Sequence, residues 1–230
     1  MTELRLSASA INDFLLCNRM YWYRRFEPEE AVSTEEIFIG QIVHKAIEKF
    51  WRDEDQATVF LESFSALSRT GLRHALSSVH GFFDNYKNLL DEKDVVEKYF
   101  TIPYPKIKGV NLVGKFDRLS KSSNVYDWKT SRSHPLTLSN NPQFMLYHYA
   151  YTQIYKTPPN LFYAGLDGKL IQYKHDEKLF DIFFNDVIYF VSNNILKGNF
   201  EPVGLFKYSA CDRCLYRTHC YKTLLGKEKR

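Results

Sequence analysis

The hydrophobic residues of this 230-residue chain change from helical spacing to strand spacing near residue 93, and this change limits the folds that the chain can adopt. Before it, Thr34–Trp51 is the clearest predicted helix. Its apolar stripe consists of Ile39, Val43, Ala46, Ile47 and Phe50. Residues 9–25 and 57–90 are predicted as further helices, with breaks in the second region near Gly71 and Gly81. A helical part of the chain therefore precedes its strands.

Three consecutive strands are predicted after the change, over residues 95–102, 111–119 and 124–129. They are followed by a helix over 142–156, a hairpin around Asp167–Gly168, a long helix over 176–197 and an irregular tail that carries cysteines. This order predicts an α/β or α+β fold with a central mixed sheet flanked by helices. We expect one domain over residues 1–230, with a helical region at 35–92 and a sheet core at 93–175.

The composition excludes several protein classes. Hydrophobic residues make up 44% and charged residues 25% of the chain, values that exclude wholesale disorder and coiled-coil architectures. No run of eighteen apolar residues exists, and the N-terminal residues lack the pattern of a secretory signal, so we expect a cytosolic protein without membrane spans. Because thiols stay reduced in the cytosol, the four cysteines indicate metal binding or catalysis more than disulfides.

The strongest candidate for chemistry is the tripeptide Asp127-Trp128-Lys129, which lies in a predicted strand. Side chains alternate along a strand, so Asp127 and Lys129 share one face and Trp128 points to the other. An acid beside a lysine can hold a metal ion and activate a water. Similar tripeptides at Asp91–Lys93 and Asp176–Lys178 fall at polar helix ends or turns, where such a pattern is expected by chance.

A second acid, Asp117, lies in the preceding strand, ten residues upstream of Asp127 and separated from it by one turn. Adjacent strands can bring the two carboxylates together, and a shared cation such as Mg²⁺ would relieve their repulsion. The alternative is that both acids lie at strand ends and form surface ion pairs. Acids in apolar strands are uncommon, so the pair favours a metal site.

Four further residues are candidates for the same site. His44 follows Gly40 by one helical turn, and a glycine inside a helix suggests that something approaches closely there. His44 is either a metal ligand or a structural hydrogen-bonding residue. Gln143 and Tyr147 share one face of the helix predicted over 142–156 and could orient a water or a phosphate oxygen, or simply pack. Glu97, at the start of a strand, could support the site.

The four cysteines form a triplet near the C-terminus and one remote residue: Cys211, Cys214 and Cys220, with Cys17. Four thiolates can hold a zinc ion or a [4Fe–4S] cluster, although a zinc ribbon usually presents two close pairs. The alternative is four unrelated thiols. If the cysteines bind one group, Cys17 connects the first helix to the tail.

Basic residues and aromatic residues alternate near both ends of the chain. The candidates for nucleic-acid contacts are Arg19, Arg24, Arg25, Arg213 and Arg217. Such patterns bind phosphates and stack on bases. A solvated charged face beside an aromatic core cluster is the alternative interpretation. A shared cysteine site would join the two basic ends into one patch.

Taken in order, these motifs resemble the PD-(D/E)XK nuclease superfamily, in its RecB-like branch that carries an iron–sulphur cluster. The motifs are the Ser7–Asn12 segment with Cys17, Gly40–His44, Gly114–Asp117, Asp127–Lys129, Gln143–Tyr147 and the cysteine triplet. The resemblance runs from about Leu6 to Tyr221. The first superfamily motif lacks the literal Pro-Asp, as is common in this branch.

The resemblance implies a restriction-endonuclease-like core and a role for each matching residue. Asp117, Asp127, His44 and the Trp128 carbonyl would bind Mg²⁺ or Mn²⁺. Lys129 would position or deprotonate the attacking water, and Gln143 and Tyr147 would order the substrate and support Lys129. The four cysteines would hold a [4Fe–4S] cluster in a subdomain made of residues 1–25 and 205–222.

The implied activity is metal-dependent hydrolysis of DNA to 5′-phosphate products by an exonuclease acting on single-stranded ends. Three other functions stay open. They are a CRISPR adaptation factor that trims spacer precursors with an integrase partner, a non-catalytic module that binds DNA ends, and a zinc-stabilised structural protein.

Overall fold

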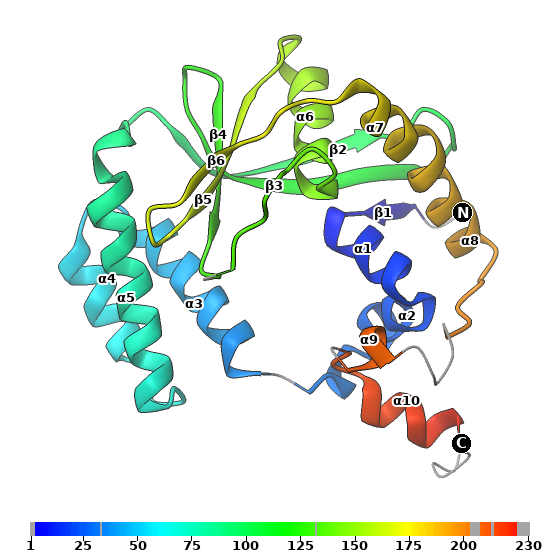
Figure 1. Cartoon of the computed structure of the whole chain (residues 1–230), viewed down its shortest axis with the longest axis horizontal. Helices are drawn as coiled ribbons and strands as arrows, with labels where there is room; N and C mark the ends of the chain where they lie inside the picture. The colour runs from blue at the N-terminus through cyan, green and yellow to red at the C-terminus, as the bar shows by residue number, and fades with distance from the viewer. Residues whose placement is uncertain (1–2, 33, 132, 203–207, 213, 225–230) are drawn as a thin grey trace. The chain divides into compact units, whose positions relative to one another are not determined.

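The computed structural model describes residues 3–32, 34–131, 133–202, 208–212 and 214–224. The chain forms two compact units, each built from separate stretches of sequence (Figure 1). Unit 1 consists of Met1–Ser33, Thr101–Val113 and Glu177–Arg230, and unit 2 consists of Thr34–Phe100 and Gly114–Asp176. No helix within the described ranges is long and apolar enough to cross a membrane.

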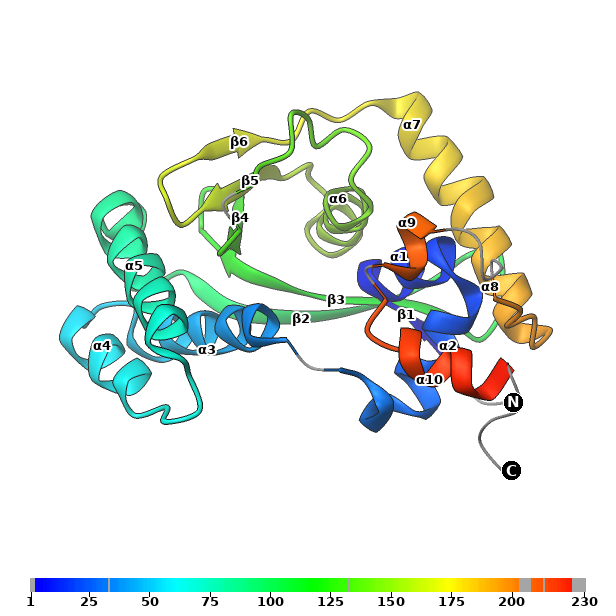
Figure 2. The same ribbon diagram turned by 60° about the horizontal axis from the view of Figure 1, so that its bottom comes forward.

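Unit 2 begins with three helices that pack against one another, α3 (Glu35–Phe50), α4 (Glu54–Glu62) and α5 (Arg69–Tyr86) (Figures 1 and 2). Asp53 and Ser68 cap α4 and α5, each by accepting a backbone N–H three residues ahead. The predicted helix at 34–51 is confirmed, with Thr34 as its N-cap residue. The apolar stripes of these helices form a buried core with residues of the sheet.

The predicted helix break at Gly81 is wrong, because Gly81 lies inside α5. A Cβ atom at this position would lie 2.0 Å from the Leu166 carbonyl oxygen. Glycine therefore allows close packing of the helix on the turn after β5, a contact that its sequence neighbours do not reveal. The predicted break near Gly71 is also misplaced, since the helix starts at Arg69 and the loop precedes it.

The sheet contains β1 (Leu4–Leu6), β2 (Val95–Pro103), β3 (Val110–Leu119), β4 (Asn124–Lys129), β5 (Asn160–Gly165) and β6 (Leu170–Gln172). Its order is β1-β3-β4-β5-β6, with β2 also paired to β3. β3 and β4 are antiparallel, and β4 and β5 are parallel. The predicted mixed sheet is confirmed, but the short parallel strand β1 was missed because three residues carry no periodicity.

Alternation along β4 determines what each face of the strand contacts. Trp128 packs edge-on against Phe82 of α5, with ring centroids 5.2 Å apart, and belongs to the buried core. Asp127, on the opposite face, accepts a hydrogen bond from Gln143 of α6 (Pro142–Tyr155). Figure 2 shows α5 and α6 on either side of this strand. The predicted separation of Trp128 from Asp127 and Lys129 is thus confirmed.

Unit 1 contains the remaining helices: α1 (Ala8–Leu16), α2 (Asn18–Phe26), α7 (Glu177–Ile182), α8 (Ile188–Leu196), α9 (Tyr208–Cys211) and α10 (Arg217–Leu224). The single helix predicted at 9–25 is wrong, because the extended backbone of Cys17 separates α1 from α2. The long helix predicted at 176–197 contains one π-helical turn at Phe183–Val187. The tail is more helical than predicted, and Val32 N–H binds the Leu215 carbonyl at 2.9 Å.

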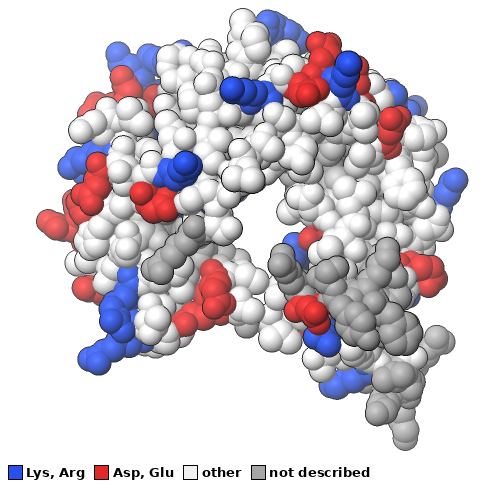
Figure 3. Space-filling view, in the orientation of Figure 1, with Lys and Arg blue, Asp and Glu red and all other residues white. Residues whose placement is uncertain are grey.

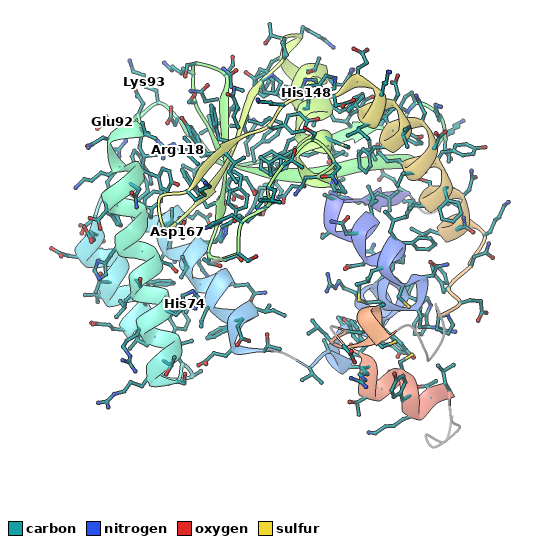
Figure 4. The ribbon with its side chains drawn as sticks, viewed as in Figure 1. His74, Glu92, Lys93, Arg118, His148 and Asp167 are labelled. Atoms are coloured by element: carbon teal, nitrogen blue, oxygen red, sulfur yellow. The ribbon has the colours of Figure 1, made fainter. Side chains whose placement is uncertain are left out.

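A buried ion pair in unit 2 connects β3 to the loop before β2. Arg118, labelled in Figure 4, donates through Nε to Asp94 Oδ2 at 2.8 Å, and both side chains are 2% exposed. Its guanidinium also lies over the Trp51 ring, 4.6 Å from the centroid. Replacing Arg118 with alanine leaves a buried carboxylate unpaired, so we expect Arg118→Ala to lower the free energy of unfolding by about 3–5 kcal/mol. Urea denaturation measures this loss.

Arg52→Ala is the matched control for that measurement. Arg52 stacks on the same Trp51 ring, 4.2 Å from its centroid, but pairs with Glu92 at the surface. Its loss should cost less than about 1 kcal/mol. Equal effects of the two substitutions would contradict the importance of the buried pair.

Candidate functional site

The side chains singled out for chemistry come from five elements of unit 2, and the structure brings them together. They are His44 on α3, Glu97 on β2, Asp117 on β3, Asp127 and Lys129 on β4, and Gln143 and Tyr147 on α6, whereas Trp128 of β4 was a candidate only through its backbone carbonyl. The chain folds this way locally because β3 and β4 form an antiparallel pair and because Asn141 caps α6 by accepting from the Gln143 N–H at 2.9 Å.

The two acids lie on neighbouring strands, as expected. Arg118 pairs with Tyr126 in the sheet, and Asp117 Oδ2 accepts the Trp128 N–H at 2.9 Å. Burial, and then the negative charge of Asp127, raise the pKa of Asp117 to about 7. A carboxyl group held in this way releases its proton when a cation binds beside it.

Three ligand groups are close enough to share a metal ion. Among the described His, Cys, Asp and Glu residues, His44, Glu97 and Asp117 form the group of three whose ligand atoms all lie within 4.8 Å of one another. His44 Nδ1 is 3.7 Å from Asp117 Oδ2. Burial, and then the positive charge of Lys129, lower the pKa of His44, which keeps the imidazole neutral and able to bind a metal. Carboxylate oxygens suit Mg²⁺ or Mn²⁺, and the imidazole nitrogen suits a transition metal such as Mn²⁺ better than it suits Mg²⁺.

Glu97 is the residue that sequence reasoning placed at the margin of the site. Its φ of +55° is unusual for a residue other than glycine, and Lys115 forms an ion pair with its carboxylate. Glu97, His44 and Lys115 line an open groove that also includes Gly40. The strand pattern contained no signal for this backbone conformation, and only the acid at the start of a predicted strand pointed to it.

Gly40 leaves room at the edge of this groove. A Cβ atom there would lie 3.6 Å from Thr130 Oγ1, an ordinary contact, so no described neighbour requires glycine. The expectation that a group of the protein approaches closely at Gly40 is therefore not met within unit 2. The open space next to His44 is instead available to a ligand of the groove.

Lys129 lies at the centre of a polar network. Its Nζ is 2.6 Å from Asp127 Oδ2 and donates to Gln143 Oε1 at 3.2 Å. Gln143 Nε2 in turn donates to Asp127 Oδ1 at 2.8 Å. Burial acts to lower the pKa of Lys129, but the carboxylates of Asp127 and Asp117 together raise it, so the ammonium stays charged.

Tyr147 completes the network from the next turn of α6. Its hydroxyl donates to the Lys115 carbonyl at 2.6 Å and accepts from Gln143 Nε2 at 2.8 Å. Burial, and then the charge of Asp127, raise the pKa of the phenol well above its usual value, which keeps the hydroxyl protonated. Gln143 and Tyr147 therefore hold Asp127 and Lys129 in place from one face of α6.

The metal shell expected from the sequence differs in part from the group that the structure assembles. His44 and Asp117 belong to both, whereas Glu97 occupies the place expected for Asp127. Asp127 is 1% exposed, and its Oδ2 lies 2.6 Å from the Lys129 ammonium. This ion pair already offsets the charge of the carboxylate, so the ligand role of Asp127 stays a prediction.

We expect the metal-free protein to lose stability as the pH rises towards 8, and Mn²⁺ to restore it. The ordinary pKa of an aspartate is 3.8, and that of Asp117 in the folded chain is about 7. The folded state therefore binds a proton that the unfolded state does not, and the stability gained from this proton is lost as the pH rises through 7. The cation then takes the place of the proton. The increase in melting temperature caused by Mn²⁺ should therefore be larger at pH 8 than at pH 6.

Asp117→Asn is the control for this experiment, because an amide does not titrate. Its melting temperature should lack this part of the pH dependence and should respond less to Mn²⁺. Equal Mn²⁺ shifts at the two pH values in the parent protein would contradict the assignment.

The four cysteines line one pocket of unit 1, together with Arg19 and Met20. Among the described residues, no three of these thiols have all their sulphur atoms within 4.8 Å of one another. Four thiolates around one zinc ion lie about 3.8 Å apart, from Zn–S bonds of about 2.3 Å in a tetrahedron. The thiols are thus gathered, but spaced more widely than a single ion requires.

The arginines expected to contact nucleic acid have different surroundings. Arg24 Nη1 is 2.6 Å from Asp13 Oδ2, and Arg217 Nη1 is 2.8 Å from Asp212 Oδ1. Arg19 lies over the Trp22 ring, 5.4 Å from its centroid, while Arg25 is exposed. Arg213 lies outside the described residues.

In unit 2, acidic and basic side chains are interspersed over the face of α4 and α5 shown in Figure 3.

A family model described as the PD-(D/E)XK nuclease superfamily matches residues 5–221 of the chain. A comparison with curated proteins finds no match. The crystal structure of a protein named "Putative exonuclease" from Eubacterium rectale is similar to this chain, with a TM-score of 0.57 and 14% identity over 94% of this chain and 87% of that one. At that identity the likeness concerns the fold.

A second solved structure, of the protein SSO0001, shares 15% identity over 96% of this chain and 87% of its own. Its TM-score is 0.45, which is too low to support an argument.

Proposed function

Since this chain belongs to the PD-(D/E)XK nuclease superfamily and is a nuclease, we propose that it hydrolyses phosphodiester bonds of DNA with a divalent metal ion. We further propose exonuclease action on single-stranded ends with 5′-phosphate products, in the cytosol. The observation that supports catalysis is the convergence of His44, Glu97 and Asp117 next to the charged pair of Asp127 and Lys129. The family match and the mixed sheet confirm the predicted restriction-endonuclease-like α/β fold.

The metal would be held by His44, Glu97 and Asp117, with Asp127 and the Trp128 carbonyl as further donors. A divalent ion in this position polarises the scissile phosphate and lowers the pKa of a bound water. The chain itself supplies a neutral imidazole and buried carboxylates, which are the protonation states that a metal needs. A module that only binds DNA ends would have no physical need for buried acids of like charge.

Lys129 would stabilise the negative charge that develops on the phosphate. The raised pKa of its ammonium favours a positioning and electrostatic role over removal of a proton from water. Gln143 and Asp127 fix the direction of the ammonium, at 3.2 Å and 2.6 Å, so little reorganisation is needed during the reaction. Tyr147 acts through Gln143 and is a positioning residue.

The test is a cleavage assay on end-labelled single-stranded and double-stranded DNA, with and without Mn²⁺. We expect shortening of the single strand from its ends only when Mn²⁺ is present, with products that ligase accepts as 5′-phosphates. Products cut internally would exclude the exonuclease assignment. Absence of cleavage under every condition would exclude the nuclease mechanism at this site.

We also propose that Cys17, Cys211, Cys214 and Cys220 hold a [4Fe–4S] cluster, which places the chain in the RecB-like branch. Two observations support this proposal. The four thiols line one pocket, and a [4Fe–4S] cluster takes four thiolates, one for each iron. In addition, Arg19 lines the same pocket, and its Nε–H is buried without a partner among the described residues, so sulphur atoms of a cluster could accept a hydrogen bond from it.

A further inference from the structure

A second polar pocket lies in unit 1, and none of its residues belongs to the metal site. Its volume is about 290 Å³, and its polar lining consists of Arg5, Ser7, Ser9, Asp13, Arg24 and Arg25. Arg5 comes from β1, the two serines from the start of α1, and Arg24 and Arg25 from the last turn of α2. Two short elements, β1 and α2, thus direct three guanidinium groups to one pocket, and the start of α1 adds two hydroxyl groups.

The charge of this pocket is positive despite its one acid. Asp13 is 7% exposed, and Arg24 Nη1 lies 2.6 Å from its Oδ2, so these two charges offset each other. Arg5 and Arg25 are exposed, and neither forms an ion pair with a carboxylate of the described residues. Two guanidinium groups therefore face the pocket with their charge uncompensated, a state that suits a bound anion.

Hydroxyl groups complete the lining. Ser7 caps α1 by accepting the Ala10 N–H at 3.2 Å, and its Oγ lies 2.9 Å from Ser9 Oγ. These contacts hold the two serine side chains at the positive end of a nine-residue helix, in the same pocket as the arginines. Guanidinium forks and hydroxyl donors around a pocket with no free carboxylate match the acceptor oxygens of a phosphate.

We propose that this pocket binds a phosphate group of the nucleic-acid substrate, through Arg5 and Arg25 with Ser9, while Arg24 stays paired with Asp13. The ligand class rests on the proposed nuclease function, but the pocket needs neither the metal nor Lys129. The phosphate is either an internal diester of the strand or the monoester at a 5′ end, and both offer the same oxygens. Binding here would hold the strand by its backbone and without base selectivity.

The experiment measures DNA binding in the Lys129→Ala background, in which cleavage is expected to be at least about 100-fold slower. Fluorescence anisotropy of a labelled single strand is recorded over a series of salt concentrations for Arg5→Ala/Arg25→Ala. The control is Lys178→Ala/Lys197→Ala, which removes two exposed charges from α7 and the end of α8 in the same unit. Removing two phosphate contacts should reduce the salt slope by about 1.4, and the control should leave the slope unchanged.

Two further variants and two ligands complete the test. Arg5→Lys/Arg25→Lys keeps the charge and should restore the salt slope, which a folding defect would not allow. The parent is then compared on a 5′-phosphorylated strand and on its 5′-hydroxyl counterpart. Tighter binding of the phosphorylated strand, with no such difference in the alanine variant, would identify the terminal phosphate as the ligand. Equal binding of the two strands to the parent would identify internal phosphates. The proposal is overturned if the alanine variant has the same slope as the control. Cleavage by the unmodified protein is scored separately, so a failure of the nuclease function is distinguishable from a failure of this pocket.

Discussion

The Lys129→Ala protein should cleave DNA at least about 100-fold more slowly than the parent protein while binding DNA with similar affinity. The ammonium is held 2.6 Å from Asp127 and is kept charged by two carboxylates, so it offers a fixed positive charge where the phosphate gains negative charge. Removing one preorganised donor of this kind costs about 10²–10³ in rate. Single-turnover cleavage with Mn²⁺ measures the chemical step, and anisotropy measures binding.

Lys121→Ala is the matched control, because Lys121 is an exposed lysine in the turn between β3 and β4. Its cleavage rate should equal that of the parent. Lys129→Arg keeps the charge but changes the geometry, and it should recover only part of the rate. Parental cleavage by the Lys129→Ala protein would reject the assignment of Lys129.

The alternation of side chains along β4 was sufficient to predict which face of the strand each side chain occupies. A period of two placed Asp127 and Lys129 together and Trp128 in the core, and the structure shows the same arrangement. Strand adjacency likewise predicted the approach of Asp117 to Asp127, because a single short turn leaves antiparallel pairing as the simplest connection.

The features that the sequence did not reveal depend on contacts between distant segments. Glu97 approaches His44 and Asp117 from a backbone with positive φ, and position 81 of α5 is glycine because the turn at Leu166 packs against it. Neither requirement appears in the local pattern of residues. Unit 1 is a partial case: the cysteine pattern led us to expect that the two ends of the chain come together, but no periodicity connects Thr101–Val113 to them.

The Cys214→Ser protein should lose its bound metal and the stability that depends on it. The parent, purified without oxygen, should be brown and carry about four iron atoms per chain, and the variant should be pale and carry less than about one. Binding by Cys17 together with Cys211, Cys214 and Cys220 would connect α2 to the tail, so part of the folding free energy of unit 1 would come from metal binding. The melting temperature of the variant should therefore fall by several degrees.

Met20→Leu is the control, because Met20 lines the same pocket and leucine has a similar volume. The Met20→Leu protein should keep both its iron and its colour. Loss of iron in Cys214→Ser alone would then show that Cys214 binds the metal, and not merely that the pocket was disturbed. A colourless parent with one zinc per chain would replace the cluster by a zinc site and would require the thiols to move closer together than they are here. A metal-free parent that melts at the same temperature as Cys214→Ser would leave the four thiols as unrelated residues.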